Sequence, residues 1–300
     1  MVSIGKKTIN GKDYHYLRYS YRENNEIKFI EKGIGRELPE NLVQLNEKFI
    51  QEIVNKRWVQ SVEEIKEKYI IKLGELSDYL KSEHLKEFGI RFTYHSNKIE
   101  GSTLTLREVA LAVNEPMVPI NKPTQDIVEA KLHMQIYENI IKSKPPIHLS
   151  MNTVKDWHSI LFSLHPNRNN FAGLIRKGRI FISGSNYVPP PGGIVCEQLI
   201  DELFEWYKTN KESMYPVLLA CLMHFYFVSI HPFEDGNGRM TRLIMNYILF
   251  KNNYPMFTLS YNIRKSYYKA LERANLKEDD MVFVNWFFKY YLKYLKKLNL

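Results

Sequence analysis

The sequence is poor in cysteine and has no long hydrophobic run. Cys196 and Cys221 are its two cysteines and no CxxC pair occurs, so neither a disulfide framework nor a structural zinc site is favoured. The longest apolar stretch, Pro216 to Ile230, is interrupted by His224 and is too short to span a bilayer. No basic-then-apolar signal pattern opens the chain. We therefore expect a cytoplasmic protein that makes no membrane contact.

Glycine and proline are also sparse, at 14 and 13 of 300 residues, which excludes a fibrous or low-complexity chain. Hydrophobic residues make up 44% and charged residues 25%, as in an ordinary globular protein. The length suits one large domain, or one domain with a small appendage. The 42 Lys and Arg against 33 Asp and Glu leave a net charge of +9, which permits an anionic partner without selecting one.

Residues 1–36 have the alternating pattern of short strands, unlike the rest of the chain. Apolar and polar residues alternate in Tyr14 to Tyr19 and in Ile27 to Ile30, while Asn10-Gly11 and residues 23–26 supply turns. This pattern predicts a small N-terminal β-meander. Its interleaved basic and tyrosine side chains could bind nucleic acid or a peptide. Rings packed against the body of the protein are the favoured interpretation.

From Leu38 onward the apolar spacing predicts a mainly α-helical body, whose first helices are separated near Gln60. A proline-rich loop at residues 116–123 marks a helix boundary. A short β-hairpin is expected at residues 180–188, where the helical period lapses. The later helices are expected at residues 194–207, 217–230, 238–250, 265–273 and 281–295.

The most informative stretch is residues 231–242, HPFEDGNGRMTR, which lies between two apolar helical runs. One helix is expected to end before Pro232 and a new one to begin near Gly236 or Gly238, because proline and glycine prevent one continuous helix. The free N–H groups of the new helix can be approached closely, since glycines carry no side chain. They predict a nest that suits phosphate oxygens.

Four side chains in this stretch fit a reaction on a phosphate. Arg239 and Arg242 are three residues apart, on one side of the first helical turn, and can add forked contacts to the same anion. Asp235 at the mouth of the nest would oppose a phosphate unless Mg²⁺ bridged the two. His231 suits removal of a proton from a hydroxyl group at neutral pH, because a histidine side chain titrates near pH ~6.5.

The same stretch resembles the Fic family signature H-x-F-x-[D/E]-G-N-G-R-x-x-R at every fixed position. The resemblance implies a mostly helical fold and transfer of AMP from ATP to a hydroxyl group of a target protein. It implies that His231 is the general base, that Asp235 holds Mg²⁺ between the α- and β-phosphates, and that Phe233 anchors the loop in the core. The phosphate-binding positions that it implies are Gly236, Asn237, Gly238, Arg239 and Arg242.

Gly238 bears on the reaction type. The Doc branch of the family, which phosphorylates its target, has lysine at the matching position. An intact glycine in this sequence therefore favours transfer of a nucleotide over transfer of a phosphate.

Two further parts of the sequence resemble the family. The expected hairpin looks like its flap, whose edge can pair with an extended target segment, and Ile180, Ile182 and Tyr187 are the candidate contacts. Tyr268 and Asn275 resemble a pair in which the tyrosine packs on adenine and the asparagine reads its edge. Plain packing of these two residues is an equal alternative.

Upstream, Ser96 to Gly101 fits the family's inhibitory motif [S/T]-x-x-x-E-[G/N], placed as in the class whose inhibitory helix precedes the domain. Gly101 suits the position just after that helix, and residues 105–108 form a capping box that starts the next. A carboxylate at a helix C-terminus opposes the helix dipole, so Glu100 is better explained by a cation outside its own helix. The resemblance implies that this cation is Arg242, and that the pairing blocks productive ATP binding.

The predicted architecture is a mainly α Fic-type helical bundle with a β-hairpin flap and an N-terminal β-meander. Its predicted domains are the β-meander (1–36), N-terminal helices (37–88), the Fic domain with its inhibitory helix (89–281) and a C-terminal helix (282–300).

Two alternatives stay open. One is a basic nucleic-acid-binding protein with an inactive Fic core, and the other is a Fic enzyme that transfers another nucleotide such as UMP. With AMP transfer, ATP is the expected co-substrate and Mg²⁺ the expected cofactor. The sequence names no target protein, which could be the chain itself. It decides neither removal of AMP from a modified target nor formation of a homodimer.

Overall fold

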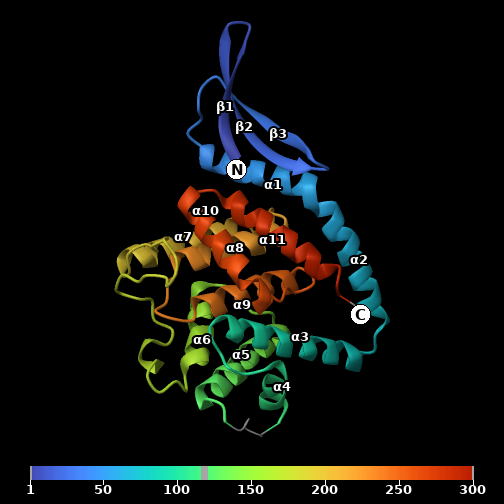
Figure 1. Ribbon diagram of the computed structural model, residues 1–300, viewed down its shortest axis with the longest axis vertical. Helices are drawn as coiled ribbons and strands as arrows, with labels where there is room; N and C mark the ends of the chain where they lie inside the picture. The colour runs from blue at the N-terminus through green and yellow to red at the C-terminus, as the bar shows by residue number, and fades with distance from the viewer. Residues whose placement is uncertain (1, 116–120, 299–300) are drawn as a thin grey trace.

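The structure of the chain is a computed structural model that describes residues 2–115 and 121–298 (Figure 1). Pro116 and Pro119 of the expected proline-rich loop lie outside the described residues. Within the described ranges, the helices are all too short or too polar to cross a membrane.

The N-terminal strands form the predicted β-meander. They are β1 (Val2–Ile9), β2 (Lys12–Glu23) and β3 (Glu26–Gly35), which pair antiparallel in the order β1-β2-β3. Asn10 and Gly11 connect the first two strands with φ values of 51° and 73°, and Asn24 and Asn25 connect the next two with 49° and 65°. Two left-handed central residues are what a tight hairpin turn needs, and asparagine and glycine adopt them readily.

One face of the sheet packs on the helices, as the favoured interpretation of the tyrosines expects at Tyr19. Leu17, Tyr19 and Ile30 are buried in the same apolar cluster as the helical core. The Tyr19 hydroxyl donates to Oδ1 of Asn285 at 2.6 Å and accepts from Nη1 of Arg57 at 2.5 Å. Several basic side chains of the sheet are ion-paired, in Lys6–Asp13, Lys7–Glu31, Arg18–Glu31 and Lys28–Glu23.

Beneath the sheet, α1 (Leu42–Val54) continues through a single π-helical turn, η1 (Asn55–Val59), into α2 (Gln60–Glu75). The predicted separation near Gln60 is therefore wrong. Gln60 has φ −53° and ψ −49°, and the local sequence holds no glycine or proline that would stop the helix. The break comes later, where Ser77 caps the next helix by accepting a hydrogen bond from the N–H of Leu80.

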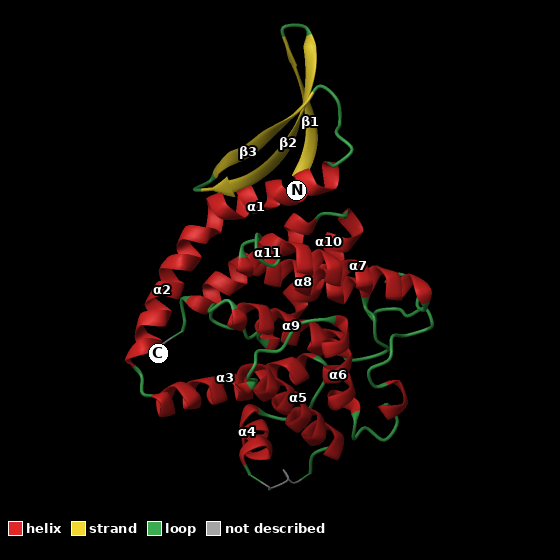
Figure 2. Ribbon diagram, turned by 180° about the vertical axis from the view of Figure 1, so that it is seen from behind, coloured by secondary structure: helices red, strands yellow, loops and turns green. Residues whose placement is uncertain are grey.

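The remaining helices confirm the expected helical body. They are α3 (Asp78–Ile99), α4 (Leu106–Asn114), α5 (Thr124–Lys142), α6 (Met151–Phe162), α7 (Ile194–Asn210), α8 (Pro216–Ile230), α9 (Asn237–Lys251), α10 (Arg264–Lys277) and α11 (Asp280–Leu295), with 3₁₀ turns at Asn169–Phe171 (η2) and Tyr261–Ile263 (η3). Seen from behind, α8, α9 and α11 lie between the sheet end of the molecule and the α3–α6 end (Figure 2).

The central helices are buried on most sides. In α8, all residues from Val217 to Phe225 are buried, so the helix has no polar face and can only lie inside the protein. α8 packs on α9, α7 and α11, and α9 also packs on α3, α5 and α6. The loop that joins α8 to α9 is therefore held by two helices fixed in the core.

The predicted limit between 36 and 37 falls in the segment between β3 and α1, but the other two predicted domain limits fall inside helices. The limit between 88 and 89 falls inside α3, and that between 281 and 282 falls inside α11. Residues of the sheet, of α1 and of α11 belong to the same buried cluster as the central helices.

Candidate active site

The loop between α8 and α9 has a fixed shape that follows from its sequence. α8 ends at Ile230, and His231 caps it in the left-handed conformation with φ 55° and ψ 60°. Gly236, with φ 77°, caps the start of α9. Left-handed backbone is strained for most residues, so the chain places glycine at one of these two positions and keeps a histidine at the other.

Asn237 and Phe233 close this loop. Oδ1 of Asn237 accepts from the N–H of Phe233 at 2.9 Å, and Nδ2 donates to the Phe233 carbonyl at 2.7 Å. The Phe233 ring is buried, as the resemblance implied, and stacks on the His158 ring with centroids 3.9 Å apart. Both polar atoms of the Asn237 side chain are thus used inside the loop, where they shape it.

His158 supports the loop from α6, a role that no sequence motif indicates. Its Nδ1 accepts from the N–H of Gly173 at 2.8 Å, so its Nε2 carries the proton and donates to the Asp235 carbonyl at 3.0 Å. Burial lowers the pKa of His158 to about 4, with Arg239 acting in the same direction. His158 is therefore a neutral side chain that holds the loop backbone.

His231 is poised as a neutral base. Its Nδ1 lies 3.0 Å from the Val228 carbonyl, which can only accept, so Nδ1 carries the proton and Nε2 keeps its lone pair. Burial lowers the pKa of His231, and the charge of Arg176 adds to this, while the bond to Val228 acts in the opposite direction. At neutral pH the ring is mostly neutral and able to take a proton.

Arg242 is buried and held by α3. Its Nε donates to Oγ of Ser96 at 3.0 Å, and its Nη2 donates to the Ser96 carbonyl at 3.0 Å and to Oε1 of Glu100 at 2.6 Å. The pairing of Glu100 with Arg242 is therefore present. A Cβ on Gly238 would clash with the same Oε1, so the Glu100 carboxylate lies against the first turn of α9.

The end of α3 is built as the sequence predicts. Gly101, with φ 105°, follows the Glu100 cap, and the N–H of Ser102 donates to the Asn97 carbonyl at 3.0 Å. This helix ending is the Schellman motif, which favours glycine at the position of Gly101. Thr105 and Glu108 form the expected capping box of α4. The chain thus stops α3 at the point that puts Glu100 beside Arg242.

Arg239 has a different partner, on α5, that sequence reasoning missed. Its Nη1 forms an ion pair with Oε2 of Glu129, and its Nη2 lies 3.4 Å from Oδ1 of Asp235. Glu129 is 110 positions away in the sequence and belongs to no recognised motif. Both arginines of the predicted phosphate site are therefore paired with carboxylates.

Asp235 lies at the mouth of the site and is ionised. Its Oδ1 accepts from the N–H of Gly236 at 2.5 Å, and its Oδ2 forms an ion pair with Arg168. Burial raises the pKa of Asp235, but Arg239 and Arg168 lower it more, so the pKa lies below its usual value. Mg²⁺ is commonly held by one or two carboxylates together with phosphate oxygens, and this ionised carboxylate beside a phosphate nest fits that donor set. The described residues contain no cluster of three or more His, Cys, Asp or Glu that would hold a metal alone.

The candidate adenine residues lie two turns apart on α10. Tyr268 is 46% exposed, and its hydroxyl lies 3.4 Å from the Ile99 carbonyl. Burial raises the pKa of the Tyr268 hydroxyl, and the nearby charge of Glu100 adds to this. Asn275 donates to the Leu271 carbonyl of its own helix at 3.0 Å. The preceding Tyr267 is buried and bonded to His224, so it belongs to the core.

The flap segment has a turn but forms no strands. Gly184 is left-handed with φ 76°, and the N–H of Ser185 donates to the Ile182 carbonyl at 3.1 Å. No ladder joins the two sides among the described residues, so the expected hairpin at 180–188 is wrong as regular β-structure. Side chains hold the segment instead: the Tyr187 hydroxyl donates to the Ser229 carbonyl at 3.1 Å.

Ile180 and Ile182 are only partly exposed. Oε1 of Glu272, on α10, accepts from the N–H of Asn186 at 2.6 Å and from the Ser185 hydroxyl at 3.3 Å. The flap is thus tied to α10 on one side and, through Tyr187, to the end of α8 on the other.

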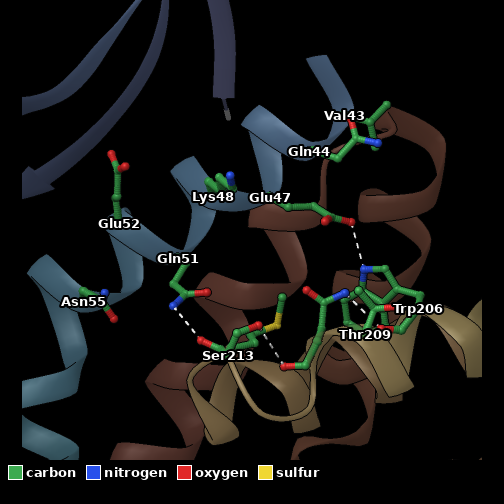
Figure 3. Close-up of a pocket in the computed structure, with 12 residues that line it drawn as sticks. Val43, Gln44, Glu47, Lys48, Gln51, Glu52, Asn55, Trp206, Thr209 and Ser213 are labelled. Carbon is green, nitrogen blue, oxygen red and sulfur yellow. Dashed lines mark hydrogen bonds between the residues drawn. The ribbon is translucent and has the colours of Figure 1, made fainter. Parts of the chain in front are cut away.

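A separate cleft of about 700 Å³ lies between α1 and the C-terminal end of α7 (Figure 3). Trp206 Nε1 donates across it to Glu47 at 2.9 Å, and Gln51 donates to the Ser213 carbonyl at 3.4 Å. Its lining contains no residue of the 231–242 loop, so this cleft is distinct from the candidate active site.

The buried histidine, the helix N-terminus and the two buried arginines together make the α8–α9 loop the candidate site of this helical fold. Residues 148–249 match the model of the Fic/DOC family, so this part of the chain is similar to that family. The range is narrower than the expected 89–281 and contains the whole 231–242 loop.

Two curated relatives extend the similarity. The chain is 31% identical over 198 residues to the protein adenylyltransferase Fic of Nematostella vectensis. The aligned residues cover 64% of this chain and 44% of the relative. It is 29% identical over 234 residues to the protein adenylyltransferase Fic of Drosophila virilis, which covers 73% of this chain and 46% of the relative. The chain spans less than half the length of these curated relatives.

The fold resembles that of a solved fragment of Fic-1 from C. elegans, with a TM-score of 0.70 and 21% sequence identity over 86% of this chain and 75% of that one. This likeness and the observed elements confirm a mainly α-helical Fic-type fold with a small N-terminal sheet.

Proposed function

We propose that this chain transfers AMP from ATP to a Ser, Thr or Tyr hydroxyl group of a target protein and releases pyrophosphate. The observation that carries the proposal is His231, a neutral imidazole at the end of α8, in the loop that leads to α9, whose Nδ1 is bonded to Val228 and whose Nε2 keeps its lone pair. The similarity to protein adenylyltransferases supports it. The target class is a protein hydroxyl, and the chain itself is one candidate target.

The chemistry follows from these positions. The hydroxyl proton passes to Nε2 of His231 as the hydroxyl oxygen bonds to the α-phosphorus. The bond from the α-phosphorus to its bridging oxygen breaks, and pyrophosphate leaves with the electron pair. His231 starts neutral because its pKa is lowered, so no prior deprotonation is needed at neutral pH.

The nucleotide would be held by the loop and by α9. The N–H groups at the start of α9 and the guanidinium groups of Arg239 and Arg242 would bind its phosphates. Asp235 would hold Mg²⁺, which neutralises phosphate charge when bound. Tyr268 and Asn275 would face the adenine.

The target would be held by the flap. Ile180, Ile182 and Tyr187 lie on the segment that Tyr187 and Glu272 tie to the site, and would contact an extended piece of the target.

Glu100 would keep the site inactive. Its carboxylate pairs with Arg242 and lies against Gly238, at the place that a phosphate would take. Ser96 holds the same arginine toward α3. ATP that binds while this pairing persists would lack the arginine contact and lie in a non-productive pose.

The deciding experiment is incubation with Mg²⁺ and ATP labelled either at the α- or at the γ-phosphate. Glu100→Gly is expected to raise protein labelling by at least about tenfold, equivalent to about 1.4 kcal/mol. Adding His231→Ala to this variant is expected to lower the labelling rate by about 10²- to 10⁴-fold. Label from the α-phosphate alone indicates nucleotide transfer.

Glu87→Gly is the matched control, because it puts the same glycine in an exposed turn of α3 away from Arg242. Equal labelling of the Glu100→Gly protein with and without His231 would overturn the catalytic assignment. Competition by unlabelled UTP tests the alternative donor. If a labelled product loses its label in the presence of the protein that has Glu100, but keeps it with the Glu100→Gly variant, the protein with Glu100 removes AMP.

A further inference from the structure

Arg176 is a buried cation that donates to four backbone carbonyl groups. Its side chain is 1% exposed. Nε donates to the His231 carbonyl at 2.7 Å and Nη1 to the Gly178 carbonyl at 2.7 Å. Nη2 donates to the carbonyls of Pro190 at 2.6 Å and Ile230 at 3.2 Å. A buried charge is costly unless its donors are satisfied, so this placement needs all four acceptors.

Two of these acceptors belong to the C-terminal end of α8. The last carbonyls of a helix have no partner within it and form the negative end of its dipole, so a guanidinium group there is favourable. His231 also has the left-handed conformation, which costs about 1–2 kcal/mol for a residue with a side chain. The bond from Arg176 holds the His231 carbonyl in that conformation, and the conformation sets where the imidazole points.

The other two acceptors, Gly178 and Pro190, lie at the two ends of the flap. The backbone of Arg176 adds two more bonds: its N–H donates to the Pro232 carbonyl at 2.9 Å, and its carbonyl accepts from the N–H of Gly193 at 2.9 Å. The ends pass each other closely near here, since a Cβ on Gly192 would clash with the Gly178 carbonyl. One residue therefore closes the flap and fastens it to the loop that carries His231.

We propose that Arg176 is a positioning residue for the transfer reaction: it joins the flap and His231 into one unit, so that a hydroxyl group held by the flap meets Nε2. This inference rests on the proposed function, which gives the flap the task of holding the target. Arg176 itself does not touch the reacting atoms. The bond from Tyr187 to Ser229 ties the flap to the same end of α8.

The charge of Arg176 also acts on the base. Three charged groups influence the pKa of His231: Arg176 lowers it, while Glu100 and Asp235 raise it, beside the effects of burial and of the Val228 bond. Replacing Arg176 by a neutral residue should therefore raise the pKa of His231. Arg176→Lys keeps the charge but has one nitrogen, which cannot reach four carbonyls in different directions.

Two measurements test the proposal without any need for catalysis. Trypsin can cut after Lys177 and Arg179, which are exposed where the chain enters the flap. Arg176→Gln is expected to speed cleavage at these two sites at least about tenfold, equivalent to about 1.4 kcal/mol of easier local opening. NMR titration of labelled histidines is expected to show a higher pKa for His231 in Arg176→Gln and a pKa near that of the wild type in Arg176→Lys.

Arg107→Gln, which replaces an exposed arginine of α4, is the matched control. It should leave the cleavage rate and the pKa of His231 unchanged. In the Glu100→Gly background, both Arg176 variants should slow AMP transfer while retaining ATP binding. The proposal is overturned if folded Arg176→Gln matches Arg107→Gln in both cleavage and pKa, or if neither Arg176 variant folds. Loss of labelling in every variant, with the cleavage and pKa changes present, would instead reject the proposed function.

Discussion

The arginines of the candidate site are each held by an acid from outside the motif. Glu100 from α3 pairs with Arg242, and Glu129 from α5 pairs with Arg239. A phosphate group offers the same forked acceptor geometry as a carboxylate, so ATP would exchange one set of ion pairs for another. The carboxylates of Glu100 and Glu129 therefore balance the charges of the two arginines that we propose bind phosphate.

Glu129→Gln tests this exchange. Breaking a buried ion pair by neutralising one partner leaves the other charge uncompensated, so we expect the variant to lose about 3 kcal/mol of stability. ATP should restore part of the loss, and the rise in melting temperature on adding ATP and Mg²⁺ should exceed that of the wild type. Thermal unfolding with and without ATP measures both effects. Glu138→Gln, which neutralises a partly exposed acid on the same helix that pairs with Lys142, is the control; identical behaviour of the two variants would contradict the prediction.

The stability of the chain should fall with acid, and His158 should account for part of the fall. Its pKa is about 4 in the folded protein, below the ordinary 6.5, so it favours folding fully above pH 6.5 and loses this effect as the pH falls toward 4. Between pH 7 and pH 5 this one group should cost about 2 kcal/mol. His158→Gln can keep a donor for Asp235 and an acceptor for Gly173 but does not titrate. Urea unfolding at both pH values should show that His158→Gln loses less unfolding free energy between pH 7 and pH 5 than the wild type does, by that amount. An equal loss in the two proteins would contradict the assignment.

At the scale of elements, the sequence predicts well what local signals control. α8 begins at Pro216, a favoured first helical residue, and Pro232 and Gly236 set the loop before α9. Gly101 ends α3 through its positive φ and Thr105 caps α4 with its side chain, and both signals lie within a few residues of the helix end that they set. The placement of Glu100 beside Arg242 follows because these local signals fix where α3 stops.

Elements shaped by distant contacts were not predictable in the same way. The helix through Gln60 continues because neither glycine nor proline interrupts it, although the apolar period changes there. The flap has the composition of a hairpin, but Arg176, Tyr187 and Glu272 hold it by side chains, so no ladder is needed. Glu129 was missed for the same reason, since its partner lies on another helix far along the chain.

At the scale of the whole molecule, the N-terminal unit and the helices of the candidate active site share one core. Trp58, in the π-helical turn below the sheet, stacks on Phe288 of α11 with ring centroids 4.8 Å apart. α11 packs on α8, whose end carries His231. Glu63 of α2 accepts hydrogen bonds from Tyr215 at 2.9 Å and from Tyr254 at 2.6 Å, on either side of the α8–α9 pair in sequence.

Because of this shared core, a cavity in the N-terminal unit should destabilise the active site as well. Trp58→Ala is expected to cost about 3–5 kcal/mol. Hydrogen exchange measured by mass spectrometry should show that residues 42–75 and residues 216–251 lose protection together. Both regions should also unfold in a single denaturation transition. Ile71→Ala, on the exposed side of α2, should leave both regions unchanged. If Trp58→Ala instead loosened residues 42–75 alone, the sheet and its helices would be a separate unit resting on the helices that carry His231, and the coupling from Trp58 to His231 would not exist.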